Sequence, residues 1–223
     1  MKKNKIKDTG LEVTELSFGT SSLGSMPDTY GYEVPEQRAQ ETLKRFFQGP
    51  VNMLDTSRNY AMGESEKRIG IAIKENGGWP ENFVLSTKID RNMDTLVLDK
   101  KRTRESIEES LKTLNVDSVD ILFLHDPEYV KDVNDITKKD GALDELFKIK
   151  EEGLAKAVGL AMGKINIMFP LLKNWDFDVI INHNRYTLLN READEMYSYA
   201  HSKNISIFNA APYAGGVLAK GPS

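Results

Sequence analysis

Residues 103–125 read TRESIEESLKTLNVDSVDILFLH, in which a helical pattern runs into a strand pattern. Apolar side chains recur at Ile107, Leu111 and Leu114, which is the spacing of one helix face. The apolar run that follows, Val119–Leu124, is far too short to span a bilayer and is typical of a buried strand. A helix that leads into a buried strand is the repeating unit of α/β proteins.

The same alternation continues in both directions along the chain. We expect seven strands, at residues 15–19, 51–55, 83–89, 119–125, 155–160, 179–186 and 205–210. Between them we expect six helices, at residues 35–47, 64–76, 103–114, 141–152, 164–172 and 191–201, with Thr103 as the cap of the third. This alternation predicts right-handed βαβ crossovers and one parallel sheet.

The order of elements favours an α/β fold of the (β/α)8 TIM-barrel type over a doubly wound sheet. A doubly wound sheet usually carries a Gly-rich phosphate turn after its first strand, and residues 19–24, GTSSLG, approximate one only loosely. Residues 3–14 contain the turn Asp8-Thr9-Gly10 between two β-capable segments, which predicts a β-hairpin. No linker divides the chain, so we expect one domain over residues 1–223.

The expected elements stop short of a full barrel. The sequence ends at Gly221-Pro222-Ser223, soon after the seventh strand, whereas a (β/α)8 barrel needs a last strand and helices to close. Without them the first and seventh strands would present unpaired backbone groups. We therefore expect a barrel that lacks its last strand and helices, in a chain that is C-terminally incomplete.

Composition excludes several classes of function. With 30 Lys and Arg against 34 Asp and Glu, the net charge of −4 gives no field that attracts nucleic acid or an anionic membrane. The absence of Cys excludes disulfides, thiolate zinc sites and Cys nucleophiles, and three His make a His-rich metal site improbable. Residues 1–8 lack the apolar core of a secretory signal. We expect a soluble, cytoplasmic protein without metal, membrane or nucleic-acid partners.

Polar side chains mark the ends of three neighbouring expected strands. Asp55 ends the second strand and Tyr60 lies in the loop after it, Lys88 lies near the end of the third, and His125 ends the fourth. Catalytic groups of barrel enzymes lie where strands end and βα loops begin, so we expect these four at one rim. Each alone has a structural explanation, such as a surface lysine or a turn-forming Asp, but their joint placement favours a site.

These residue types suit proton transfer to a carbonyl oxygen. A Tyr phenol has an ordinary pKa of about 10, and the adjacent ammonium of Lys88 would lower the pKa of Tyr60. Asp55 would hold Lys88 charged, while His125 would donate a hydrogen bond to the carbonyl oxygen. Because the set has no nucleophile, a nicotinamide cofactor, NADP(H) or NAD(H), is the natural source of a hydride.

Successive motifs resemble the signatures of the aldo-keto reductase superfamily. They are DTSRNY at 55–60, GESE at 63–66 followed by IG at 69–70, STK at 86–88 and LHDP at 124–127. The N-terminal hairpin resembles that family's barrel-bottom plug, and residues 186–190 and 210–216 resemble its sixth- and seventh-strand segments. The segment AAPYAGG at 210–216 is especially similar to the branch that acts on aldoses such as L-fucose or L-galactose.

The resemblance implies an oxidoreductase that uses NAD(P)(H) to interconvert a carbonyl, in an aldehyde, ketone or aldose, and an alcohol. It implies that Tyr60 is the general acid/base, that Lys88 and Asp55 tune it, and that His125 orients the substrate carbonyl.

The resemblance also places the cofactor next to His183, Ala210 and Pro212, with departures from the family pattern. Where many members carry Ser-Asn after the fifth strand to hold the nicotinamide carboxamide, residues 159–162 read GLAM. His183 stands where a glutamine is usual, and Ala210 stands where an aromatic side chain often stacks on the nicotinamide. The family's adenosine-phosphate site belongs to the last strand and helix.

Two other interpretations stay open. The expected missing end and the altered cofactor contacts also fit a catalytically silent barrel that acts as a binding or regulatory relative. A phosphate-binding lyase or isomerase barrel is a third class, and its Gly-rich seventh and eighth loops would fall at the end of this chain or beyond it.

Overall fold

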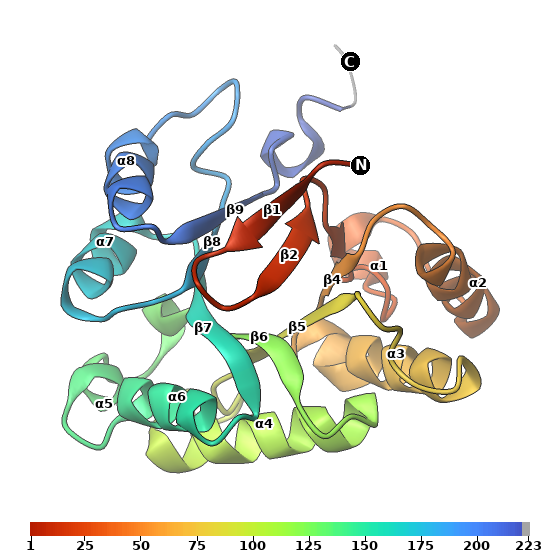
Figure 1. Ribbon diagram of the computed structural model, residues 1–223, viewed down its shortest axis with the longest axis horizontal. Coiled ribbons are helices and arrows are strands. Elements are labelled where there is room, and N and C mark those ends of the chain that lie inside the picture. The colour runs from red at the N-terminus through yellow and green to blue at the C-terminus, as the bar shows by residue number, and fades with distance from the viewer. Residues whose placement is uncertain (220–223) are drawn as a thin grey trace.

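A computed structural model describes residues 1–219 and shows two sheets (Figure 1). The N-terminal hairpin pairs β1 (Lys3–Ile6) with β2 (Leu11–Thr14) in antiparallel register. The main sheet has seven parallel strands in sequence order: β3 (Phe18–Gly19), β4 (Met53–Asp55), β5 (Val84–Ile89), β6 (Val119–His125), β7 (Ala155–Met162), β8 (Val179–His183) and β9 (Ser206–Ala210). Every pair of neighbours is therefore joined by a crossover connection.

Helices surround this curled sheet (Figure 1). They are α1 (Pro27–Tyr30), α2 (Glu36–Phe47), α3 (Glu64–Glu75), α4 (Lys100–Leu114), α5 (Asn134–Thr137), α6 (Ala142–Glu151), α7 (Ile165–Asn174) and α8 (Asp194–Ser202). Short 3-10 turns follow β4, β6 and β9, at Tyr60–Gly63, Pro127–Tyr129 and Ala214–Gly216. Residues 1–219 contain no helix that is long and apolar enough to cross a bilayer.

Two apolar clusters hold the layers together, one on each face of the sheet. On β6, Leu122 and Leu124 pack outward against the helices, whereas Ile121 and Phe123 belong to the inner cluster. Because successive strand residues point to opposite faces, burial of both faces explains the uninterrupted apolar run Ile121–Leu124. The hairpin contributes its apolar residues to the inner cluster, which it therefore plugs: Ile6, Leu11 and Val13.

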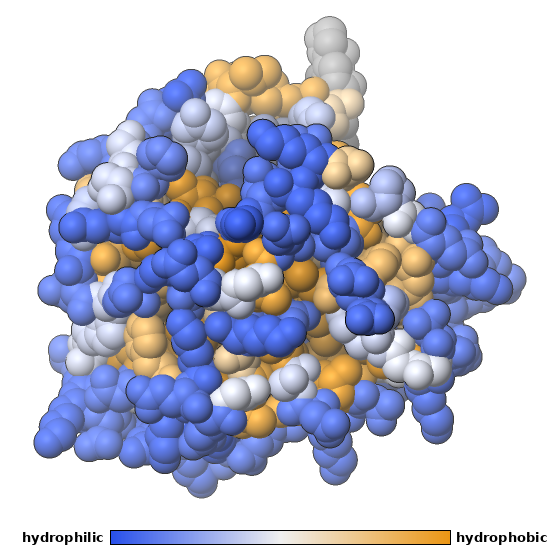
Figure 2. Space-filling view, viewed as in Figure 1, coloured by the Kyte–Doolittle hydropathy of each residue, from blue (hydrophilic) through white to orange (hydrophobic). Residues whose placement is uncertain are grey.

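Polar contacts tie the hairpin to both ends of the sheet. Asn52, just before β4, accepts a hydrogen bond from the backbone N–H of Thr14 at 2.8 Å. On the opposite side, the backbone N–H of Lys7 donates to Ser206 Oγ in β9 at 3.1 Å. The face that carries the hairpin has hydrophilic side chains on its surface, with apolar side chains visible around the hairpin (Figure 2).

The end strands β3 and β9 flank an opening in the sheet. They do not pair with each other, and a cavity of about 470 Å³ lies between them, bordered by Gly19, Asp55, Ala210 and Pro212 among others. The predicted fold is thereby confirmed for the described residues: a (β/α) barrel with a hairpin plug and seven strands in its wall. That residues 1–223 form one domain that is C-terminally incomplete stays a prediction.

Several expected boundaries were wrong. The third long helix, α4, begins at Lys100, and its cap is Asp99, whose side chain accepts a hydrogen bond from the backbone N–H of Arg102 at 2.8 Å. Thr103 therefore lies inside the first turn instead of capping it. The strand expected at 179–186 ends at His183, because Asn184 adopts a positive φ of 61° that breaks the extended backbone.

Candidate active site

The structure brings the four predicted catalytic residues to one rim of the barrel. Asp55 and His125 are the last residues of β4 and β6, and Lys88 lies one residue before the end of β5. Tyr60 opens the short turn that follows β4. All of these strands are parallel neighbours, so their carboxyl ends meet at the same edge, as the sequence predicted.

Lys88 forms a buried ion pair with Asp55. Its side chain is 2% exposed, and Nζ lies 2.6 Å from Asp55 Oδ2 and 2.6 Å from the carbonyl oxygen of Thr56. Ser86 Oγ donates to the other carboxylate oxygen at 2.7 Å. Burial by itself would lower the pKa of Lys88, but the charge of Asp55 and its hydrogen bond raise this pKa above its ordinary value. Lys88 is therefore a permanent cation at the rim.

Tyr60 packs between this cation and the imidazole. Lys88 Nζ lies 4.6 Å from the centre of the phenol ring, and the ring of His125 meets it edge-on at 5.9 Å. Lys88 lowers the pKa of Tyr60, as expected, but the net pKa of the phenol lies above its ordinary value. Desolvation raises the pKa of the phenol by more than Lys88 lowers it, and the charge of Asp55 adds to the rise. The phenol is therefore protonated at neutral pH.

Asp90 completes the site and was missed by the sequence analysis. It is 1% exposed, and its Oδ1 lies 2.6 Å from His125 Nδ1. Burial raises the pKa of Asp90, but the contact with His125 and hydrogen bonds from Ser57 and the backbone of Asn59 outweigh it and lower this pKa. A sequence signal existed, because Lys88 and Asp90 are two residues apart and so share one face of an extended segment.

The three predicted cofactor contacts lie around the same rim. His183 is the register partner of Ala210 across β8 and β9, and Ala210 and Pro212 border the cavity that also contains Asp55. His183 Nε2 lies 4.0 Å from a carboxylate oxygen of Asp126, the residue after His125. The structure thus places these residues close to the four predicted catalytic residues, while their role toward a cofactor stays a prediction.

The segment 159–162, which the sequence comparison set against the family's Ser-Asn pair, ends in two buried residues. Ala161 and Met162 are each 2% exposed or less, and the carbonyl oxygen of Met162 accepts a hydrogen bond from Asn182 at 2.8 Å. Beside them, Asp126, Glu128 and His183 bring potential ligand atoms within 4.8 Å of one another. The polar groups of this part of the rim therefore come from β6, β8 and the loop after β6.

A buried carboxyl lies behind the site and predicts a pH-dependent stability. Glu66 on α3 is fully buried and accepts a hydrogen bond from Thr87 at 2.6 Å. Desolvation raises its pKa above the ordinary value, although the Thr87 hydrogen bond opposes this. The folded chain thus holds this proton to higher pH than the unfolded chain, and stability falls as pH rises from the ordinary Glu value through the raised one.

We expect Glu66→Gln to remove this slope, because glutamine has no proton to lose. Urea midpoints should show the variant more stable than the wild type at pH 8, with a smaller difference at pH 5. Glu64→Gln, at a half-buried position of the same helix, is the matched control and should show no such pH dependence. An equal difference at both pH values for Glu66→Gln would contradict the raised pKa.

With this geometry in place, comparison with known proteins gives the class. Residues 15–222 match the aldo/keto reductase family, so the chain belongs to this family. The resemblance seen in the motifs is thereby confirmed.

Two curated relatives are sugar dehydrogenases. The chain is 31% identical to L-galactose dehydrogenase of Arabidopsis thaliana over 95% of its own length and 65% of that protein's. It is 28% identical to D-threo-aldose 1-dehydrogenase of a Pseudomonas species over 95% of its length and 69% of that protein's. The chain therefore spans just under two thirds of the plant relative.

Among solved structures, the chain superimposes on the holo form of an aldo-keto reductase from Bacillus halodurans. The TM-score is 0.82 at 25% sequence identity, and the match covers 100% of this chain and 70% of that one. The described part of the chain thus has the fold of this neighbour.

Proposed function

We propose that this chain carries the catalytic centre of an oxidoreductase that uses NADP(H) or NAD(H) to interconvert a carbonyl and an alcohol. The observation that supports it is the buried Lys88–Asp55 pair against the face of Tyr60, with His125 edge-on to the same ring. Aldoses are the favoured substrates, because the two sugar dehydrogenases above are relatives over nearly the whole of this chain. The cytoplasmic location expected from the sequence belongs to the same proposal.

Reduction of a carbonyl requires a hydride at carbon and a proton at oxygen. The reduced nicotinamide supplies the hydride when bound. Tyr60, protonated at neutral pH, donates the proton to the oxygen as negative charge develops on it. Lys88 stabilises the phenolate that is left, and Asp55 keeps Lys88 in place. In the reverse direction the same phenolate accepts the proton of the alcohol.

The residues around the cavity fit a flat nicotinamide ring. Gly19, Ala210 and Ala211 are small, and they border the cavity of about 470 Å³ together with Pro212 and Asp55. Ala210 and Pro212 would contact the ring, and His183, the register partner of Ala210, would be in position to bind its carboxamide. The pyrophosphate and adenosine contacts are outside this proposal.

Binding and turnover test the proposal together. Titration of the chain into NADPH should enhance the nicotinamide emission with a micromolar dissociation constant, about −8 kcal/mol. The two tryptophans are poor reporters, because both pack against the apolar cluster on the helix side of the sheet. Trp79 lies there in an aromatic group with Phe46, Phe47 and Phe83. L-Galactose with NADP⁺ or NAD⁺, followed at 340 nm, and a small aldehyde with NADPH or NADH then test turnover.

A matched pair of variants locates the binding site. Ala210→Glu places a long charged side chain in the cavity and should weaken NADPH binding at least tenfold. Ile71→Glu, at a partly exposed position on α3, should leave binding unchanged. Binding that Ala210→Glu does not affect would remove Ala210 and its cavity from the proposal.

A catalytically silent barrel is the second candidate. It is favoured by the apolar pair Ala161 and Met162 and by a relative named as a probable voltage-gated potassium channel subunit beta in Arabidopsis thaliana. This relative is 26% identical over 98% of the chain and 66% of its own length. Saturable NADPH binding without turnover of any aldose or aldehyde would support this candidate and contradict the oxidoreductase.

A further inference from the structure

We propose that Asp90 makes His125 act as a charged hydrogen-bond donor, because it holds the Nδ1 proton and leaves Nε2 able to donate only in the imidazolium form. The inference rests on the proposed function, since the acceptor at Nε2 is the carbonyl oxygen of the substrate. Asp90 is then a positioning residue that acts through His125.

The first step is that Nδ1 faces only acceptors. Asp90 Oδ1 lies 2.6 Å from it and Ser57 Oγ lies 3.1 Å from it. The single hydroxyl proton of Ser57 is already used, because Oγ donates to Asp90 Oδ2 at 2.5 Å. Ser57 can therefore offer Nδ1 only a lone pair. A nitrogen between two acceptors must itself carry the proton.

The second step is that Asp90 is ionised and fixed. It is 1% exposed, and its Oδ2 accepts a second hydrogen bond, from the backbone N–H of Asn59 at 3.0 Å. The contact with His125 and these hydrogen bonds outweigh burial and lower the pKa of Asp90. An ionised carboxylate is an acceptor only, so it selects one tautomer of the ring.

The third step concerns Nε2, the nitrogen left for the substrate. With the proton on Nδ1, a neutral ring has a lone pair at Nε2 and repels a carbonyl oxygen. The imidazolium carries protons on both nitrogens and can donate. His125 therefore supports reduction only while it is charged.

Several charged and titratable groups lie around the imidazole of His125. Asp90 and Asp126 lie near its two nitrogens, and Tyr60 packs edge-on to its ring. Lys88, which is paired with Asp55, lies beyond Tyr60, and His183 lies beyond Asp126. Asp90 lies at Nδ1 and Asp126 Oδ2 lies 3.8 Å from Nε2, so a carboxylate is near each nitrogen. Lys88 is the nearby fixed cation, and its ion pair with Asp55 offsets its charge.

Asp90→Asn tests the proposal in two independent ways. In the ligand-free chain, ¹⁵N–¹H spectra of the imidazoles should show the neutral His125 with its proton on Nδ1, with His183 and His201 as references. The amide of asparagine can present its NH₂ to Nδ1, which should move the proton to Nε2. Asp120→Asn, on β6 at the start of the strand and paired with Lys156, is the matched control and should leave the tautomer unchanged.

The second readout is the pH profile of carbonyl reduction. Asp90→Asn should lower kcat/KM on the order of 100-fold. It should also abolish the decline of reduction at high pH, because the neutral imidazole of the variant carries its proton on Nε2 and can still donate. A merely structural role for Asp90 would leave the pH at which carbonyl reduction declines unchanged.

The outcomes separate this proposal from the function. A wild-type spectrum with the neutral proton on Nε2 overturns the Asp90 proposal, as does an Asp90→Asn variant with an unchanged tautomer and pH profile. If Asp90→Asn does not fold, the wild-type spectrum still decides the tautomer. Absence of turnover in the wild type overturns the proposed function, while the spectrum tests the Asp90–His125 pair without cofactor or substrate.

Discussion

Replacement of Tyr60 by phenylalanine is expected to lower kcat for carbonyl reduction by about 10³-fold or more, because it removes the proton donor. The ring that packs against Lys88 and His125 remains, so fold and NADPH affinity should stay close to those of the wild type. Steady-state kinetics, fluorescence titration and circular dichroism measure the three quantities. The change should fall on kcat and leave KM nearly constant, as expected for an interaction made in the transition state.

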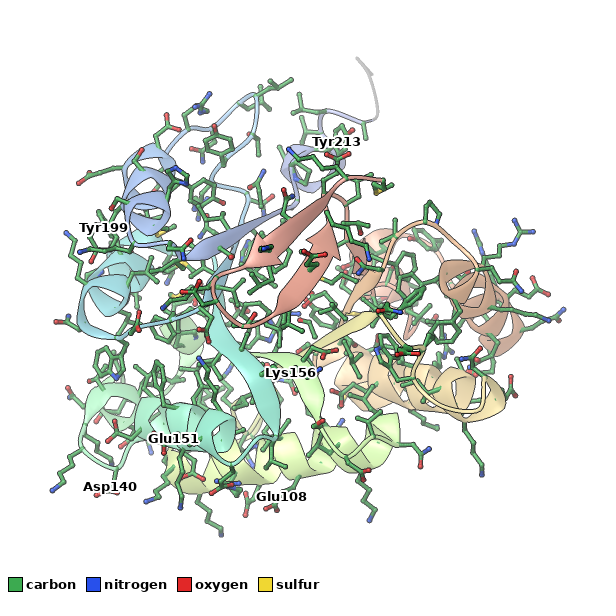
Figure 3. All side chains as sticks on the ribbon, in the orientation of Figure 1. Glu108, Asp140, Glu151, Lys156, Tyr199 and Tyr213 are labelled. Atoms are coloured by element: carbon green, nitrogen blue, oxygen red, sulfur yellow. The ribbon has the colours of Figure 1, made fainter. Side chains whose placement is uncertain are left out.

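Tyr199→Phe is the matched control. Tyr199 lies on α8, on the outside of the barrel, where its ring packs on Phe169 (Figure 3). Loss of its hydroxyl should leave kcat unchanged. Turnover by Tyr60→Phe at the wild-type rate would contradict the role of Tyr60, and a parallel loss of NADPH affinity would mean that the substitution disturbs the pocket instead of the proton transfer.

Replacement of Lys88 by methionine is expected to affect both stability and activity. The variant leaves the carboxylate of Asp55 without its partner in a site where the lysine is 2% exposed. Loss of one partner from a buried pair typically costs about 3–5 kcal/mol. Turnover should also fall by about 10² or more, because the phenolate of Tyr60 loses its stabilising charge. Urea unfolding and initial rates measure the two effects.

A double variant separates the two effects. Lys88→Met with Asp55→Leu removes both charges, and replacement of a whole buried pair is often close to neutral for stability. We expect stability to recover and turnover to stay low. Recovery of both would contradict the catalytic role of the pair, and recovery of neither would mean that Lys88 stabilises the fold through contacts other than Asp55.

Lys156→Met is the control for an ordinary ion pair on the same sheet. Lys156 lies on β7 (Figure 3) and pairs with Asp120 at 2.8 Å, but its side chain is 60% exposed. Exposed pairs contribute at most about 1 kcal/mol. We therefore expect a small change in stability and no change in turnover.

The fold was predictable because the strands are buried on both faces and the helices on one. Apolar runs such as Val119–Leu124 and helix faces such as Ile107, Leu111 and Leu114 record those environments directly. Boundaries were less predictable, because local hydrogen bonds decide them. Asp99 caps α4, which begins at Lys100, three residues before its first buried position, and nothing in the apolar spacing marks this cap.

The site was predictable where residue type and strand order were sufficient. Asp55, Lys88 and His125 end neighbouring parallel strands, so sequence order places them together. The pKa of Tyr60 was not predictable, because the sequence reveals its charged neighbour but not its desolvation. Asp90 lies one residue beyond the expected strand, and its partner is 35 positions away, so its role required the fold.

The hairpin also sets an order of events during synthesis. Lys7 reaches its partner Ser206 across 199 positions of sequence. At a translation rate of about 5–20 residues per second, the first strands wait on the order of 10–40 s before β9 leaves the ribosome. During that interval the side chains of Ile6, Leu11 and Val13 cannot yet pack in the complete inner cluster. Nascent chains of this protein should therefore bind holding chaperones through their earliest residues, and release should follow the emergence of β9.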